Sequence, residues 1–164
     1  MNNANEEPVD IWGRLDDLDD AELAMLVEAA ASVIADNTNE AGARIYLEMP
    51  PRPAGQILKS TLADAGVAVD DEEAAELVRD EVVTRQLAVH VLRSLAQQPV
   101  IAAEIEVAYR ARQRMLVIDA GVISAAALLL LVLKLKRVKI GGVDVSFYDA
   151  RQSALDSIRR MLGM

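Results

Sequence analysis

Apolar residues recur at helical spacing through the first half of the chain, between short polar breaks. One apolar stripe, Leu23, Leu26, Val27, Ala30 and Ile34, predicts a helix over residues 20–35, with Asp19 or Asp20 as its N-cap. Polar residues 37–39 end that helix, and a short second helix capped by Thr38 or Asn39 is expected to run to about residue 48.

The prolines at positions 50, 51 and 53 predict a loop, because proline lacks a backbone donor and disfavours helix before it. A third helix is expected over residues 54–65, ending at Gly66. Asp70 and Glu73 have the spacing of a capping box, and Val69 stands where a hydrophobic staple would. They precede an expected long fourth helix over residues 71–97.

The C-terminal third has a different pattern. Pro99 suits the first position of a helix, and no strong breaker follows before residue 133, so one long helix is predicted whose second half is apolar. Around Gly141-Gly142 the alternating residues predict a hairpin, with Ile140 opposite Val143 and Lys139 opposite Asp144. An amphipathic helix is expected over residues 151–162.

These elements predict a mainly α fold with an α+β tail. Residues 1–15 are expected to form a disordered acidic lead, and residues 16–98 a helical bundle. Residues 99–164 are expected to hold the partly apolar helix, the β-hairpin and the short terminal helix.

The apolar segment 115–133 has two interpretations. As a helix it would rise roughly 28 Å, close to the thickness of a hydrocarbon core, and Asp119 is its only formal charge. It is either a membrane span, constitutive or conditional, or the buried central helix of a soluble fold. The residues that would form this membrane or core helix are Val122, Ile123, Leu128, Leu129, Leu130, Leu131 and Leu133.

The tail favours the soluble interpretation. A two-stranded hairpin is marginal alone in water, and the terminal helix also has an apolar face to cover. The nearest apolar surface in sequence is residues 122–133, so we expect the hairpin and terminal helix to pack on it. The flanks of the segment are basic on both sides and set no membrane orientation.

Charge narrows the partner classes. The net charge is −9, which argues against nucleic acid, because phosphate contacts need clustered Lys and Arg. A local basic strip could still meet an acidic surface, perhaps on another copy of the chain, or lipid headgroups. The residues of this predicted interaction strip are Arg110, Arg112, Arg114, Lys134, Lys136, Arg137 and Lys139.

Catalytic chemistry finds little support in the sequence. The chain has no cysteine, and His90 is its one histidine, inside a predicted helix where a packed or surface role is typical. The acidic clusters 16–20 and 70–73 suit capping better than metal binding, since neither has the spacing of a calcium loop. We therefore expect no catalytic, cofactor or metal site and no enzymatic activity.

The last forty residues or so resemble a known group of proteins. An apolar helix (125–133), a basic strand (134–140), a Gly141-Gly142 turn, an apolar strand (143–149) and a short amphipathic helix (154–162) are similar to the C-terminal part of small effector-associated proteins of bacterial conflict systems. The resemblance implies an adaptor or constant component beside an effector domain.

The sequence thus predicts a non-enzymatic interaction or adaptor protein that binds a protein partner or itself. The alternative is a small single-pass or conditionally inserting membrane protein that uses residues 115–133. The corresponding locations are cytoplasmic and membrane-associated.

Overall fold

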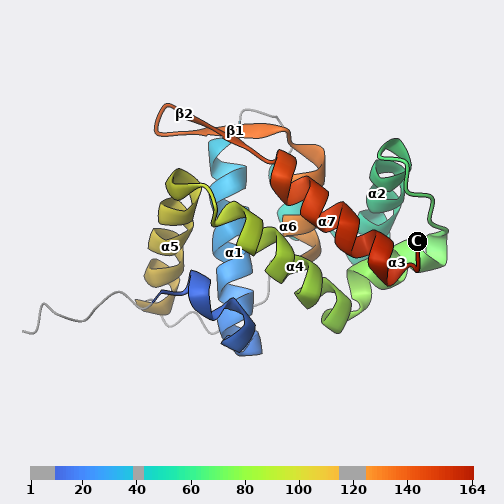
Figure 1. Cartoon of the computed structure of the whole chain (residues 1–164), viewed down its shortest axis with the longest axis horizontal. Coiled ribbons are helices and arrows are strands. Elements are labelled where there is room, and N and C mark those ends of the chain that lie inside the picture. Colours follow the sequence, from blue (N-terminus) through green and yellow to red (C-terminus); the bar gives the residue numbers. More distant parts are fainter. Residues whose placement is uncertain (1–9, 39–42, 115–124) are drawn as a thin grey trace, which may run out of the picture.

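The structure is a computed structural model that describes residues 10–38, 43–114 and 125–164 (Figure 1). It confirms a mainly helical fold with one antiparallel hairpin near the C-terminus, followed by a helix. In chain order the elements are η1 (Trp12–Asp17), α1 (Asp20–Asn37), η2 (Ala43–Glu48), α2 (Pro51–Asp64), α3 (Asp71–Arg79), α4 (Glu81–Leu95), α5 (Pro99–Arg114), α6 (Ala125–Lys134), β1 (Arg137–Ile140), β2 (Val143–Ser146) and α7 (Tyr148–Met161).

The N-terminal elements begin earlier than expected. The short 3-10 helix η1 buries Leu15, and Ile11 before it is also buried, so the expected disordered lead does not extend to residue 15. Asp19 caps α1 as predicted: the Glu22 N–H donates to its Oδ1 at 2.8 Å. This backbone hydrogen bond lowers the pKa of Asp19, because it stabilises the ionised carboxylate.

The proline segment is helical, which corrects the expected loop. Helix α2 starts at Pro51 and includes Pro53 in its first turn. The first N–H groups of a helix have no intrahelical acceptor, so proline costs little there. The helix ends as predicted at Gly66 (φ 83°), where the Val67 N–H donates to the Leu62 carbonyl at 2.8 Å.

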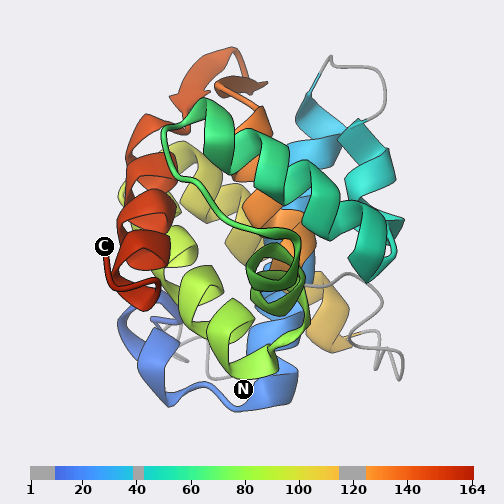
Figure 2. The same cartoon turned by 90° about the vertical axis from the view of Figure 1, so that its right-hand side faces the viewer.

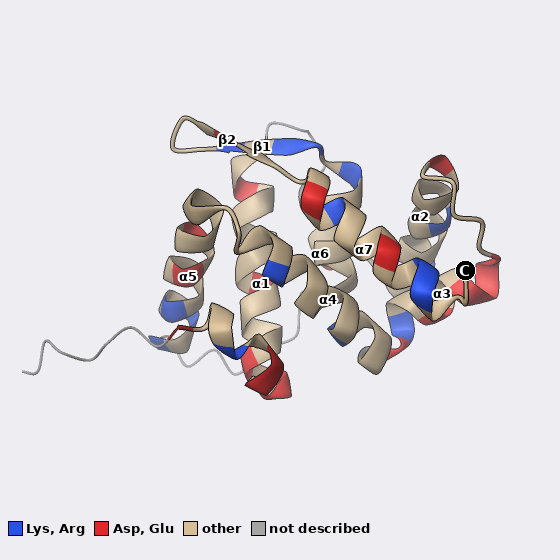
Figure 3. Cartoon of the chain, in the orientation of Figure 1, with Lys and Arg blue, Asp and Glu red and all other residues tan. Residues whose placement is uncertain are grey.

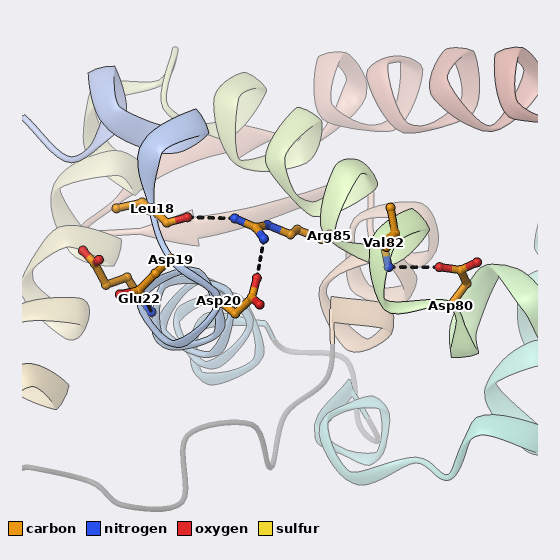
Figure 4. A network of polar contacts seen from close by, with 7 residues as sticks. All are labelled: Leu18, Asp19, Asp20, Glu22, Asp80, Val82 and Arg85. Carbon is orange, nitrogen blue, oxygen red and sulfur yellow. Dashed lines mark hydrogen bonds and ion pairs between the residues drawn. The ribbon is translucent and has the colours of Figure 1, made fainter.

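The expected long fourth helix is two helices. The capping box forms at Asp70 and Glu73, but α3 ends at Arg79 and α4 begins at Glu81. Between them Asp80 is extended (φ −74°, ψ 109°), and its Oδ1 accepts from the Val82 N–H at 3.0 Å (Figure 4). Asp80 therefore acts as an N-cap, which separates two differently packed helices.

The prediction of one straight helix from Pro99 to residue 133 is also wrong. Helices α5 and α6 both pack along α1, whose 18 residues span roughly 27 Å (Figure 1). One continuous helix would be about twice as long as α1, so both halves could not lie beside it. Val122 and Ile123 lie outside the described residues.

Helix α6 is the centre of the molecule, as the core interpretation predicted. Figure 2 shows it enclosed by α1, α2 and α4. All residues from Ala126 to Leu133 are buried, including the predicted core residues Leu128, Leu129, Leu130, Leu131 and Leu133. Among the residues that the structure describes, no helix is long and apolar enough to cross a membrane.

The hairpin has the predicted register. Val138 pairs with Val145, Lys139 with Asp144 and Ile140 with Val143, around the positive φ of Gly141 and Gly142. Helix α7 starts earlier than expected, at Tyr148, and packs most extensively on α4 rather than on α6. The apolar surface that it needs comes from a helix far away in sequence. Buried side chains from Ile11 to Ile158 form one continuous core.

Candidate protein-binding surface

The structure divides the predicted basic strip between two distant surfaces (Figure 3). Helix α5 starts at the hairpin, where Gln98 Nε2 donates to the Ser146 carbonyl at 2.5 Å and the Ser146 N–H donates back to Gln98 Oε1 at 3.2 Å. The helix then runs away for 16 residues, which carries Arg112 and Arg114 roughly 20 Å from the hairpin.

Most of the α5 cations make contacts within the chain. Arg110 pairs with Glu106 on the same helix at 2.8 Å. Arg112 is only 23% exposed, lies 3.7 Å from the Glu28 carboxylate and donates to Ser32 Oγ at 2.9 Å, so it ties α5 to α1. Arg114 is exposed at the end of the helix.

The hairpin cations are arranged differently. Four of the predicted interaction residues lie between the last residue of α6 and the end of β1; all four are exposed, and none has an ion pair within the described part of the chain. We call this set the basic hairpin surface: Lys134, Lys136, Arg137 and Lys139. The structure thus brings together the second half of the predicted strip and leaves its first half on the far end of α5.

Two arginines of α4, by contrast, are neutralised by nearby carboxylates. Arg85 on α4 pairs with Asp20 and donates to the Leu18 carbonyl at 2.8 Å, which fixes the start of α1 (Figure 4). Arg93 pairs with Asp16 at 2.9 Å. The acidic cluster at residues 16–20 therefore binds arginines of α4 and caps α1.

A hollow of about 340 Å³ adjoins the basic hairpin surface. It lies between the solvent face of the hairpin and the first turn of α7, and its lining residues are Lys136, Arg137, Asp144, Ser146, Tyr148 and Arg151. The Arg151 guanidinium is held by Nη2, which donates to the Leu135 carbonyl at 3.1 Å.

Sequence reasoning missed Tyr148 and Arg151. Tyr148 is 66% exposed, and Val143 at the other end of β2 is 48% exposed, so apolar side chains flank the cations. The spacing of Tyr148 and Arg151 puts them on one helix face. The helical spacing of these two residues could not be recognised, because the terminal helix was expected to start only at residue 151.

An acidic surface lies elsewhere, at the right-hand end of Figure 3. We call it the acidic helix surface, and its exposed members are Asp64, Asp70, Asp71, Glu72 and Glu76. Lys59 pairs with Asp71 at 2.8 Å, which lowers the pKa of Asp71 and raises that of Lys59. Glu72 and Glu76 are four residues apart on α3 and have no ion pair within the described residues.

The remaining candidate groups are the carboxylates that could hold a metal and His90. No cluster of three His, Asp or Glu side chains there could hold a metal ion. His90 is half-buried, and burial lowers its pKa, with further lowering by Arg160 and Arg93.

Comparison with known proteins adds no relative. No protein-family model, curated protein or solved structure matches this chain.

Proposed function

We propose that this chain is a non-enzymatic protein-binding module that associates with further copies of itself. The basic hairpin surface of one copy docks on the acidic helix surface of the next. The observation that carries the proposal is the set of four exposed cations at the end of α6 and on the hairpin, none of which has an ion pair within the described residues, in a chain with net charge −9.

Charge complementarity supports this partner. Opposite surface charges steer association and fix its orientation, although each exposed pair adds little affinity. Tyr148 and Val143 beside the cations supply apolar contact area, and Tyr and Arg are common anchors of protein interfaces. The resemblance to effector-associated components fits an adaptor of this kind.

The two surfaces are different patches of one molecule, so the proposed contact is head-to-tail. A head-to-tail contact forms a ring if its rotation closes and an open chain if it does not. The proposed association therefore predicts a series of oligomers rather than a single symmetric dimer.

Complementary charge variants test the proposal by sedimentation velocity. Wild type is expected to associate at about 50 mM salt and to dissociate at about 500 mM salt, because screening weakens exposed charge pairs. Lys136→Glu with Arg137→Glu removes the basic surface, and Glu72→Lys with Glu76→Lys removes the acidic one. Each double variant alone is expected to be monomeric.

Mixing the two double variants provides the sharpest readout. Each retains the surface that the other lacks, and the two reversed surfaces are also oppositely charged, so an equimolar mixture is expected to regain the association that neither variant shows alone. The matched control is Arg14→Glu with Arg114→Glu, two exposed arginines outside the basic hairpin surface, which changes the net charge equally and should leave association intact. A wild type that stays monomeric at low salt, or double variants that associate like wild type, would contradict the proposal.

A further inference from the structure

We propose that the hollow between the hairpin and α7 binds a phosphate-class oxyanion. This goes beyond the proposed function, because the hollow could receive the phosphoryl group of a free compound as well as that of a modified protein. The lining brings together three cations, Lys136, Arg137 and Arg151, with the hydroxyl groups of Ser146 and Tyr148.

The backbone explains why these groups meet. Arg137 pairs with Ser146 at the open end of the hairpin, and the Phe147 N–H donates to the Lys136 carbonyl at 3.0 Å just beyond it. Helix α7 then begins at once, so its first turn returns Tyr148 and Arg151 to the same place. The site is therefore formed by two adjacent rigid elements.

The available donors match a tetrahedral oxyanion. Arg151 is anchored through Nη2, and its buried Nε has no hydrogen-bond partner within the described residues, so a small turn of the guanidinium would be needed to offer that N–H to a ligand. The Ser146 hydroxyl oxygen accepts the Tyr148 N–H at 3.2 Å, which leaves its own proton available for donation. Arginine forks bind phosphate oxygens through paired N–H groups.

The charge balance favours a compact oxyanion that carries at least two negative charges. Asp144 also lines the hollow, so the three cations leave a net lining charge of about +2. A single carboxylate carries half that charge and fewer acceptor oxygens. A long polyanion would meet the negative charge of the rest of the chain, whereas a single phosphoryl group meets only the hollow.

Calorimetric titration with pyrophosphate, at constant ionic strength, tests the site. Arg151→Lys keeps the charge but loses the planar fork, and about a tenfold weaker binding is expected. Arg160→Lys is the matched control: it makes the same substitution at an exposed arginine of the same helix, outside the hollow, and should bind like wild type. Ser146→Ala, on the solvent face of β2, tests the site independently if Arg151→Lys fails to fold.

Further titrations with peptides distinguish the source of the phosphoryl group. Tighter binding of a phosphoserine peptide than of pyrophosphate, with competition between the two, supports the site and identifies a modified protein as the ligand. Binding of pyrophosphate alone supports the site and identifies a free compound. Equal binding by Arg151→Lys, Ser146→Ala and wild type, or binding of neither pyrophosphate nor the phosphoserine peptide, would overturn it.

Arg151→Lys also separates this inference from the proposed function. The variant preserves every charge of the basic hairpin surface, so head-to-tail association should persist while pyrophosphate binding weakens. The two proposals can therefore fail separately, because a loss of phosphate binding in this variant does not count against self-association.

Discussion

At the scale of single residues, Asp80 decides how the middle of the chain is divided. The apolar period runs without interruption through residues 71–97, so the local pattern predicts one helix. The structure ends α3 there because α3 packs on α2, whereas α4 packs on α7. The two helices point toward different partners, and that information lies far from Asp80 in the sequence.

Replacing Asp80 tests its capping role. Asp80→Ala is expected to lower the free energy of unfolding by about 1 kcal/mol, because the Val82 and Val83 N–H groups lose their acceptor. Urea unfolding followed by circular dichroism measures the change. Glu76→Ala, an exposed position within α3, serves as the control and should change stability by less than about 0.5 kcal/mol. Equal loss in both variants would rule out a specific cap.

The Lys59–Asp71 pair gives a pH-dependent prediction. Its hydrogen bond lowers the pKa of Asp71 below the ordinary value of 3.8, so the stabilisation is fully present above that value and is lost as pH falls through the lower folded pKa. Lys59→Met should therefore raise the pKa of Asp71 and remove this contribution. An NMR titration of the Asp71 carboxyl carbon measures it, with Arg52→Met as the control. An unchanged Asp71 titration in Lys59→Met would contradict the assigned cause.

At the scale of elements, the hairpin shows what local pattern can predict. Its turn and register follow from Gly141-Gly142 and the alternation on either side, and both are confirmed. Val138, Ile140 and Val145 on the predicted apolar face are buried, but Val143 is exposed. Its anchoring by Gln98 could not be foreseen, because the two hydrogen bonds join residues 48 positions apart. Periodicity identifies which face of an element is buried but not which other element covers it.

Adjacent glutamines allow a matched test of that anchor. Gln98→Ala removes both hydrogen bonds to Ser146 and is expected to destabilise the hairpin by about 1–2 kcal/mol. Amide hydrogen exchange of residues 138–145 should speed up accordingly. Gln97→Ala, at an exposed neighbour, should leave the exchange rates unchanged. Unaltered hairpin exchange in Gln98→Ala would show that the packing of β1 and α7 alone holds the hairpin.

The candidate site was foreseen only in part, for the same reason. The cations of the basic hairpin surface are close together in the sequence, so their clustering could be recognised there. The separation of Arg112 from them depends on the direction of α5, and its pairing with Glu28 depends on the packing of α5 on α1. Arg151 joins the hollow only because α7 begins directly after β2.

At the scale of the whole molecule, stability depends on the central helix α6. Leu131 is 0% exposed, and its truncation by Leu131→Ala should cost about 3 kcal/mol, from lost burial and the cavity left behind. Val107→Ala, at a 66% exposed position of α5, should cost less than about 0.5 kcal/mol. Denaturant unfolding compares the two variants. Similar losses in both would contradict the central position of α6.

The position of α6 along the chain also has a consequence for biosynthesis. Helix α1 emerges early from the ribosome, but α5 and α6, which cover it, are synthesised much later. Until residues 125–134 emerge, the growing chain exposes the apolar faces of α1, α2 and α4. Exposed apolar surface of this kind recruits chaperones and promotes aggregation. A nascent chain stalled before residue 125 should therefore be protease-sensitive, and protection should appear only after α6 has left the exit tunnel.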